Sequence, residues 1–435
     1  MKRNHAFASL AAALCAAICL SVSGLAQTRP QVSARELLKE DPTRAGNLHH
    51  SYECLEGENT AAPEGYSAFY VSHFGRHGSR YLSSARELEP AMEALEFMKE
   101  KNLLTKKGEE LYQDYRKLVK AHEGMHGMLT QKGGREHRGI AARLYARVPE
   151  VFNQSGRDSV TCVSTQVHRC IQSMANFTLS LKECAPGLKV AYYAGDRYKS
   201  YLNRDTDDSE CISAAKKVED EALKEFNCDR LVSIYFRSLV DGRIGKQRPQ
   251  KFFYYLFKTG AISQCLDGDA PDFLSRFNGE ELYQLWRINN IRCYASMCNS
   301  IESKGVRNER AAYILKDIVE KADLALKEDS KVAADLRFGH DSGIGPLISL
   351  LALEGNDARI YSKDACKYWY CFQNICMGTN LQIIFYRNAE GKVLVKFLHN
   401  EKERSVPALT PVSGNYYSWP EVRSWMTDLI QQSLD

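Results

Sequence analysis

Residues 74–80 are Phe-Gly-Arg-His-Gly-Ser-Arg, and they come two residues after the apolar run Ala68–Val71. A strand that ends in two arginines and a histidine directs several cations to one point. Like charges at a partly buried strand end are costly unless an anion lies among them. Phosphate is the anion that best uses planar guanidinium groups, because each group can bind it through two hydrogen bonds. The stretch therefore predicts a phosphate site in which His77 reacts with the phosphate.

Two later segments place similar residues after predicted strands. Arg169 lies at the start of a predicted helix that follows the strand-like run Ser159–Val163, where the helix dipole also favours an anion. His340 and Asp341 follow the strand-like run Val332–Leu336. Because the carboxyl ends of parallel strands meet at one edge of a sheet, we expect the three segments to converge on one crevice.

In this order along the chain, the three segments resemble the histidine acid phosphatases, the branch of the histidine phosphatase superfamily that includes the phytases. Within that family, Leu129–Gly133, His168-Arg169-Cys170 and Val395–Glu401 are most similar to the multiple inositol polyphosphate phosphatases. That subgroup usually carries His-Ala-Glu where this chain has His340-Asp341-Ser342, which is the pattern of other acid phosphatases and phytases. The resemblance spans about residues 66–435.

The order of strand-like and helical runs predicts an α/β fold, with a three-layer core and a mostly parallel central sheet. From about residue 196 to residue 329 the chain is helix-rich and charged, which predicts an inserted, mainly helical cap domain. We expect a signal peptide at 1–26, core at 27–195, the cap at 196–330, and core again at 331–435. The resemblance implies the same arrangement, with the cap over the site and acting in substrate specificity. Residues 381–386 and 392–398 are predicted to form an antiparallel pair.

The predicted chemistry is hydrolysis of a phosphate monoester. His77 is the expected nucleophile, because a neutral imidazole can attack phosphorus and form a phosphohistidine. Asp341 would protonate the leaving oxygen and later activate water, or it caps the helix that begins beside it. We expect neither a metal nor a cofactor, since arginines supply the positive charge. The side chains expected to bind the phosphate are Arg76, Arg80, Arg169 and His340.

A basic stretch at residues 241–251 has two interpretations. Its cations include Arg243, Lys246 and Arg248. Charge runs usually face water, so a solvated loop is one interpretation. In the other, these side chains line the roof of the site and bind the non-reacting phosphates of a substrate such as phytate, which the resemblance to inositol polyphosphate phosphatases favours.

The start of the chain is typical of a signal peptide. Lys2 and Arg3 precede a largely apolar run at 6–20, and Gly24-Leu25-Ala26 offers a cleavage site. This predicts a periplasmic or secreted protein; an uncleaved N-terminal anchor is the alternative. No later segment reaches the roughly 18 apolar residues of a membrane span.

The net charge bears on what the protein binds, and the cysteine content bears on its disulfide bonds. Removal of the leader would lower the formal net charge from +4 to +2, which argues against general binding of nucleic acid or membrane surfaces. The expected partner is a small phosphorylated substrate. An even number of cysteines beyond the leader in an exported chain predicts disulfide bonds, although their pairing and the oligomeric state stay open.

Other functions remain as alternatives. Residues 122–126 are His-Glu-Gly-Met-His and fit the zinc metallopeptidase pattern, in which His122 and His126 would bind zinc and Glu123 would act as base. Gly124 inside the motif weakens the helix that this pattern requires. A non-catalytic phosphate binder would need the arginines but neither reacting side chain. Within the resembled family, a general acid phosphatase or sugar phosphatase is the alternative to a phytase.

Overall fold

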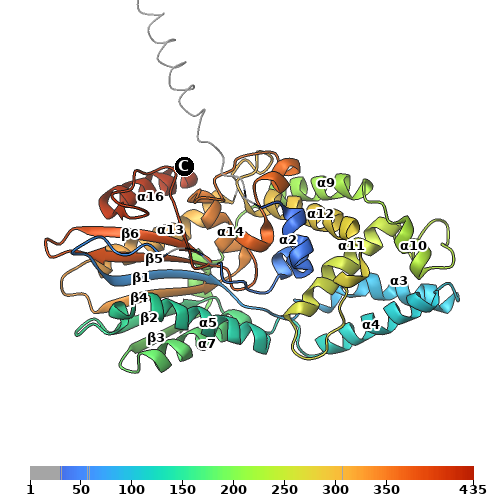
Figure 1. Ribbon diagram of the computed structural model, residues 1–435, viewed down its shortest axis with the longest axis horizontal. Helices are drawn as coiled ribbons and strands as arrows, with labels where there is room; N and C mark the ends of the chain where they lie inside the picture. The colour runs from blue at the N-terminus through green and yellow to red at the C-terminus, as the bar shows by residue number, and fades with distance from the viewer. Residues whose placement is uncertain (1–29, 31, 56, 58, 306) are drawn as a thin grey trace, which may run out of the picture.

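The computed structural model describes residues 30, 32–55, 57, 59–305 and 307–435. The predicted signal peptide lies outside the described residues. Figure 1 shows a central sheet with helices on both faces, and a lobe of helices beside it. The molecule is therefore elongated, with its α/β core and its helical lobe side by side.

The sheet has eight strands in the order β3-β2-β4-β1-β5-β6-β7, and β8 pairs with β6. The pairs on the β3 side of the sheet, as far as β1, are parallel, whereas the pairs beyond β1 are antiparallel. The predicted pair near the C-terminus is present as β5 and β6. The strands are β1 (Ser67–Arg76), β2 (Ser159–Ser164), β3 (Lys189–Ala194), β4 (Val332–Gly339), β5 (Asn380–Arg387), β6 (Val393–His399), β7 (Lys402–Arg404) and β8 (Tyr417–Ser418).

Helices cover both faces of the sheet, which confirms the predicted α/β class and its three layers. Successive side chains of a strand point to opposite faces. Val71 accordingly packs in one core with Phe177, and Tyr70 packs in the other with Ile314. One layer consists of α5 (Gln131–Arg147), α6 (Pro149–Phe152) and α7 (His168–Cys184), and the other of α13 (Asn308–Ala325), α14 (Asp341–Leu350) and α16 (Trp419–Leu434).

The helical lobe combines two stretches of the chain. Helices α3 (Glu89–Glu100) and α4 (Lys106–His122) precede β2, yet they pack against α11 (Pro249–Gly260) and α10 (Asp229–Tyr235). The lobe also contains α9 (Ser209–Lys224) and α12 (Gly279–Met297).

These contacts differ from the predicted cap boundaries of 196–330 in two ways. Residues 89–122 belong to the lobe, and α13, which falls inside 196–330, packs on β1 and β4 of the core. The physical reason is that an amphipathic pattern identifies a helix but does not identify the surface that its apolar face will meet.

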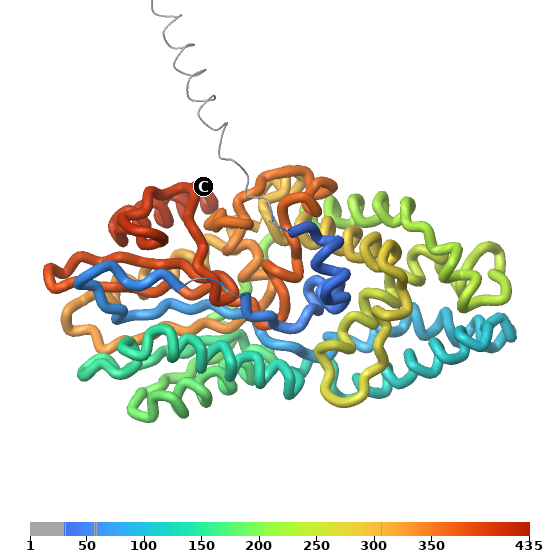
Figure 2. The backbone as a smooth tube through the Cα atoms, in the orientation of Figure 1, coloured from blue at the N-terminus to red at the C-terminus, as the bar shows by residue number. Residues whose placement is uncertain are grey.

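Short elements connect the core and the lobe. Figure 2 shows the N-terminal segment with α2 and η1 lying between the two parts. The short helices are α2 (Ala34–Glu40), α8 (Asp196–Leu202), α15 (Cys371–Asn374) and the 3-10 helices η1 (Pro42–His49), η2 (Ala85–Glu87), η3 (Ala261–Cys265), η4 (Leu274–Arg276) and η5 (Ser362–Lys367).

Two further predictions concern the whole chain. In the described part, every helix is too short or too polar to cross a membrane. The twelve cysteines of the described residues are all free thiols, most of them buried. The structure therefore does not confirm the disulfide bonds, which stay a prediction.

Candidate functional site

The ends of β1, β4 and β2 lie next to one another at the edge of the sheet that faces the helical lobe. Arg76 of β1 is opposite Gly339 of β4, and Ser164 of β2 is opposite Phe338. The backbone N–H of His77 donates to the carbonyl oxygen of Gly339 at 3.0 Å. This register brings together the predicted catalytic and phosphate-binding residues, which we call the catalytic cluster after that prediction: Arg76, His77, Arg80, Arg169, His340 and Asp341.

Arg76 is fully buried and held in a fixed plane. Its Nη1 donates to the carbonyl oxygens of Leu48 and Ile375, both at 2.8 Å. Its Nη2 donates to Oδ2 of Asp341 at 3.0 Å. Because two backbone acceptors fix one side of the guanidinium, its other side is directed at the carboxylate of the cluster.

His77 is buried with its ring Nδ1 2.9 Å from the carbonyl oxygen of Gly78. A carbonyl can only accept, so Nδ1 carries the proton and Nε2 keeps a lone pair. Burial, followed by the charges of Arg169, Arg76 and Arg80, holds the pKa of His77 well below its usual value. The imidazole is therefore neutral, with a nucleophilic Nε2.

Arg80 and Arg169 add positive charge that no described carboxylate pairs with directly. Burial and then the charges of Arg169 and Arg76 lower the pKa of Arg80 to about 10. Burial also lowers the pKa of Arg169. Three guanidinium groups thus surround one carboxylate, Asp341, and an anion would relieve their mutual repulsion.

His340 lies between β4 and α14, and its side chain contacts Arg169 at the start of α7. Its Nδ1 lies 3.4 Å from Nη2 of Arg169, and its Nε2 lies 3.1 Å from Oγ1 of Thr165. Its ring centroid is 5.8 Å from that of His77. Burial, and then the charge of Arg169, lower the pKa of His340 to about 4. His340 is therefore neutral near pH 7 and gains a proton only in acid.

Asp341 begins α14 and has two hydrogen-bonded oxygens. Its Oδ2 accepts from Arg76, and its Oδ1 accepts the backbone N–H of Ser342 at 2.8 Å. Burial raises the pKa of Asp341, but Arg76, Arg80 and His340 together outweigh that effect, and the pKa falls to about 2. The carboxyl is therefore ionised when only these side chains surround it. A bound phosphate would be required to raise its pKa.

Helix α5 supports the turn that follows His77, and sequence reasoning did not identify this contact. Glu136 of α5 accepts from the backbone N–H and from Oγ of Ser79, both at 2.7 Å. A Cβ on Gly78 would lie only 2.6 Å from the carbonyl oxygen of Gly133. Gly78 is thus required for the close approach of α5. Glu136 has no sequence signal beyond its place three residues after Gly133.

His49 and Lys258 connect the helical lobe with the catalytic cluster, and they too were missed. Nδ1 of His49 is 3.1 Å from the carbonyl oxygen of Lys258. Burial, followed by the charges of Arg80 and Arg76, lowers the pKa of His49 to about 3. Burial likewise lowers the pKa of Lys258. Neither residue lies in a recognisable motif, because their proximity depends on packing between distant segments.

The structure does not bring Arg243, Lys246 and Arg248 to the catalytic cluster. They line a separate surface pocket between α9 and the start of α11. An α-helix rises 1.5 Å per residue, so Arg248 lies about 15 Å from Lys258 along the axis of α11. The expected roof over the reacting phosphate is therefore not formed by these side chains.

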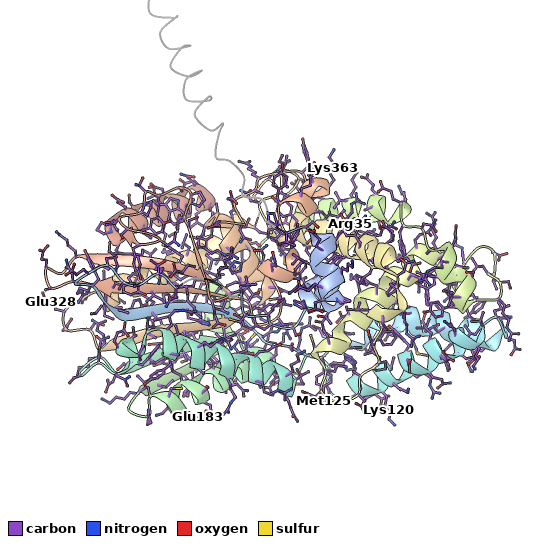
Figure 3. All side chains as sticks on the ribbon, viewed as in Figure 1. Arg35, Lys120, Met125, Glu183, Glu328 and Lys363 are labelled. Atoms are coloured by element: carbon purple, nitrogen blue, oxygen red, sulfur yellow. The ribbon has the colours of Figure 1, made fainter. Side chains whose placement is uncertain are left out.

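The zinc motif is not formed either. Helix α4 ends at His122, and the chain then turns through Gly124 and Gly127, both with positive φ angles. His122 and His126 therefore do not share one helical face, which the motif requires. Figure 3 labels Met125 of this loop at the lower surface, between the core and the lobe. Among the described residues, no group of three or more His, Cys, Asp or Glu side chains is arranged to hold a metal ion.

No protein-family model matches the chain, but its fold is similar to that of several solved phosphatase structures. The multiple inositol polyphosphate phosphatase of Bifidobacterium longum, in complex with inositol hexasulfate, has a TM-score of 0.74 at 19% identity, covering 88% of this chain and 97% of that one. The phytase of D. castellii has a TM-score of 0.72 at 15% identity, covering 89% and 85%. The Hafnia alvei phytase has a TM-score of 0.52 at 13% identity, covering 86% and 98%. The fold is thus the histidine acid phosphatase fold that the sequence predicts.

Proposed function

We propose that this chain is a histidine acid phosphatase that hydrolyses phosphate monoesters through a phosphohistidine, with inositol polyphosphates such as phytate as its substrates. The proposal rests mainly on the environment of His77: its ring is neutral, and its Nε2 lies among three arginines. A non-catalytic phosphate binder has no need of this arrangement, since arginines alone would hold the anion.

In the first step, the lone pair of His77 Nε2 attacks phosphorus while the bond from phosphorus to the ester oxygen breaks. The proton on Nδ1 stays hydrogen-bonded to the carbonyl oxygen of Gly78, which stabilises the positive charge that develops on the ring. Arg76, Arg80 and Arg169 bind the phosphoryl oxygens, where transition-state charge is distributed. The leaving oxygen takes its proton from Asp341.

In the second step, Asp341 accepts a proton from water as the water oxygen attacks phosphorus. The bond between phosphorus and Nε2 breaks, and its electron pair returns to the ring of His77. Inorganic phosphate leaves, and Asp341 is protonated for the next cycle. Two displacements of moderate difficulty thus replace one direct hydrolysis.

Asp341 can act as an acid only when substrate is present. Its pKa of about 2 results from its arginine neighbours, chiefly Arg76, despite the opposing effect of burial. A bound phosphate competes for these guanidinium groups and places negative charge beside the carboxyl, so its pKa rises. This dependence favours an acidic working pH.

Inositol polyphosphates are favoured by fold similarity and by local charge. The solved structures that are similar to this chain include the inositol polyphosphate phosphatase of B. longum and the phytases of D. castellii and H. alvei. Lys258, whose charge acts on His49 as those of Arg80 and Arg76 do, offers a further cation for a non-reacting phosphate. The His340-Asp341 pair instead of His-Ala-Glu leaves a general acid or sugar phosphatase as the alternative. The predicted leader supports export to the periplasm or the medium.

Turnover measurements at acidic pH test this function. We expect release of phosphate from phytate with a lower KM than for glucose 6-phosphate, and no release by His77→Ala. Cleavage of simple monoesters without cleavage of phytate would instead identify a general acid phosphatase. Binding of phosphate esters without any turnover would identify a non-catalytic binder.

A further inference from the structure

A basic pocket on the helical lobe lies apart from the catalytic cluster. Its lining cations come from α9, from the segment that leads into α11 and from the first turn of α11. Lys216 pairs with Asp220, whereas none of the other lining cations forms an ion pair with a carboxylate among the described residues. The basic pocket is lined by Lys216, Lys224, Arg243, Lys246, Arg248 and Lys251, together with Asp220, Leu223, Gln247 and Gln250.

The loop that carries these cations is anchored. Two consecutive tight turns pair Val240 with Arg243 and Ile244 with Gln247. Ile244 is fully buried. A Cβ on Gly245 would lie 2.9 Å from Cα of Ala94 in α3, so the loop is pressed onto that helix. A charge run that is merely solvated needs no such anchoring.

The backbone at the start of α11 also favours an anion. The N-cap residue, Arg248, makes no side-chain capping hydrogen bond. Gln250 and Lys251 of the first turn line the basic pocket. Unsatisfied backbone N–H groups and the helix dipole stabilise negative charge at such a helix start.

We propose that the basic pocket is a second binding site, which takes one inositol polyphosphate molecule in addition to the one at the catalytic cluster. Five unpaired cations around one pocket repel one another, and a ligand with several phosphates compensates more of this charge than a single phosphate does. The identity of the ligand rests on the proposed function, whereas the existence of a polyanion site does not.

Helix α11 connects the two sites. Lys251, Tyr255 and Lys258 follow one another at helical spacing from the basic pocket toward the catalytic cluster. Nζ of Lys251 lies 5.6 Å from the ring centroid of Tyr255, and Nζ of Lys258 lies 5.3 Å from that of Tyr254. A substrate held in the pocket therefore raises the local substrate concentration near the cluster.

Calorimetric titration with myo-inositol hexakissulfate, a sulfate analogue in place of the phosphate ester, tests the proposal. At low ionic strength we expect two binding sites on the wild-type protein. The triple variant Arg243→Gln, Lys246→Gln, Arg248→Gln should lose one of them or bind it at least roughly tenfold more weakly, a change of about 1.4 kcal/mol. A control variant alters the net charge by the same amount at exposed positions outside the pocket, through Lys107→Gln, Lys327→Gln and Lys331→Gln. It should keep both binding sites.

Turnover of p-nitrophenyl phosphate shows that the variants fold and keep an intact catalytic cluster. We expect it to be unchanged in the triple variant, while kcat/KM for phytate at low salt falls several-fold. A single binding site on the wild-type protein, or equal losses in the triple and control variants, would overturn the proposal. Two binding sites without any phosphatase activity would refute the proposed function and leave the polyanion site standing.

Discussion

At the residue scale, the pKa of His77 determines whether this chemistry works in acid. An ordinary histidine has a pKa near 6.5 and would be mostly protonated, and so not nucleophilic, at the pH of an acid phosphatase. Burial and three neighbouring arginines hold the pKa of His77 well below that value. The same arginines that would bind phosphate therefore also keep the nucleophile neutral.

Asp341→Asn separates proton donation from helix capping. The single amide oxygen of asparagine can still accept from the N–H of Ser342, so the start of α14 should persist, whereas the hydrogen bond from Arg76 to the other carboxylate oxygen is lost. We expect turnover of alkyl phosphates to fall by roughly 10²–10⁴-fold. Turnover of a dinitrophenyl phosphate should fall far less, because its leaving group needs little protonation. Steady-state kinetics over a series of leaving groups would measure how the loss of turnover depends on the pKa of the leaving group.

An equal loss for every leaving group would contradict the acid role of Asp341. The residue would then act only through the start of α14 and through Arg76. Glu136 is a carboxylate beside the turn that follows His77, but it is fully engaged by Ser79 and Tyr52. It is therefore not positioned to replace the lost proton donor.

At the element scale, the start of α5 fixes the shape of the catalytic turn. Thr130 caps the helix by accepting from the backbone N–H of Gly133, and its own hydroxyl donates to the carbonyl oxygen of Ser79 at 3.0 Å. A Cβ on Gly133 would clash with that same oxygen. Backbone atoms cannot rotate out of the way as a side chain can, so this contact needs glycine.

Gly133→Ala should therefore destabilise the protein despite the higher helix propensity of alanine. We expect the free energy of unfolding to fall by about 1–3 kcal/mol, with a loss of turnover because Ser79 and Gly78 move. Gly279→Ala is the matched control, since a Cβ at that helical position meets nothing within 4 Å. It should be neutral or stabilise by up to about 1 kcal/mol. Urea unfolding of both variants checks the difference, and equal effects would contradict the close-packing account.

Prediction from sequence worked where a local pattern is sufficient. The apolar run before Arg76, the strand before His340 and the helix after Thr165 all carry their own periodicity, and each forms as expected. Convergence of the ends of β1, β2 and β4 followed from the geometry of parallel strands. These elements position the residues of the catalytic cluster, so the cluster could be predicted from the sequence.

Prediction failed where two distant segments pack together. Helices α3 and α4 have amphipathic patterns that fit a core layer as well as a separate lobe. His49 approaches Arg76 and Arg80 only because η1 lies between the core and the lobe. The basic stretch at 241–251 carries charge but no information about which surface it covers, and it lines a pocket away from the reacting phosphate.

At the scale of the whole molecule, buried histidines make stability depend on pH. His73 and His137 are both buried, and the ring of each lies beside that of Phe338. Burial lowers the pKa of His137 to about 4. Burial, followed by the charges of His137 and Arg337, lowers the pKa of His73 to about 3. Both values lie below the value near 6.5 of an unfolded chain. The unfolded state therefore binds more protons, and stability that is present above pH 6.5 declines as the pH falls toward these values.

His137→Leu should reduce this loss of stability in acid. Between pH 7 and pH 4 the wild-type protein should lose about 3 kcal/mol of unfolding free energy through His137 alone. Leucine cannot be protonated and suits both the helix and the apolar surroundings. Urea unfolding at the two pH values should thus show a smaller difference for the variant. An undiminished difference would mean that His137 does not contribute to the loss in acid.

The central claim is that His77 forms a covalent bond to phosphorus. A substrate labelled with ³²P in its phosphate, mixed with excess enzyme and quenched within milliseconds in alkaline detergent, tests it most directly. The account predicts protein-bound label that survives alkali, is released by acid, maps to the peptide containing His77 and is absent from His77→Ala. Rapid turnover without any protein-bound label, or label on His77→Ala, would contradict it.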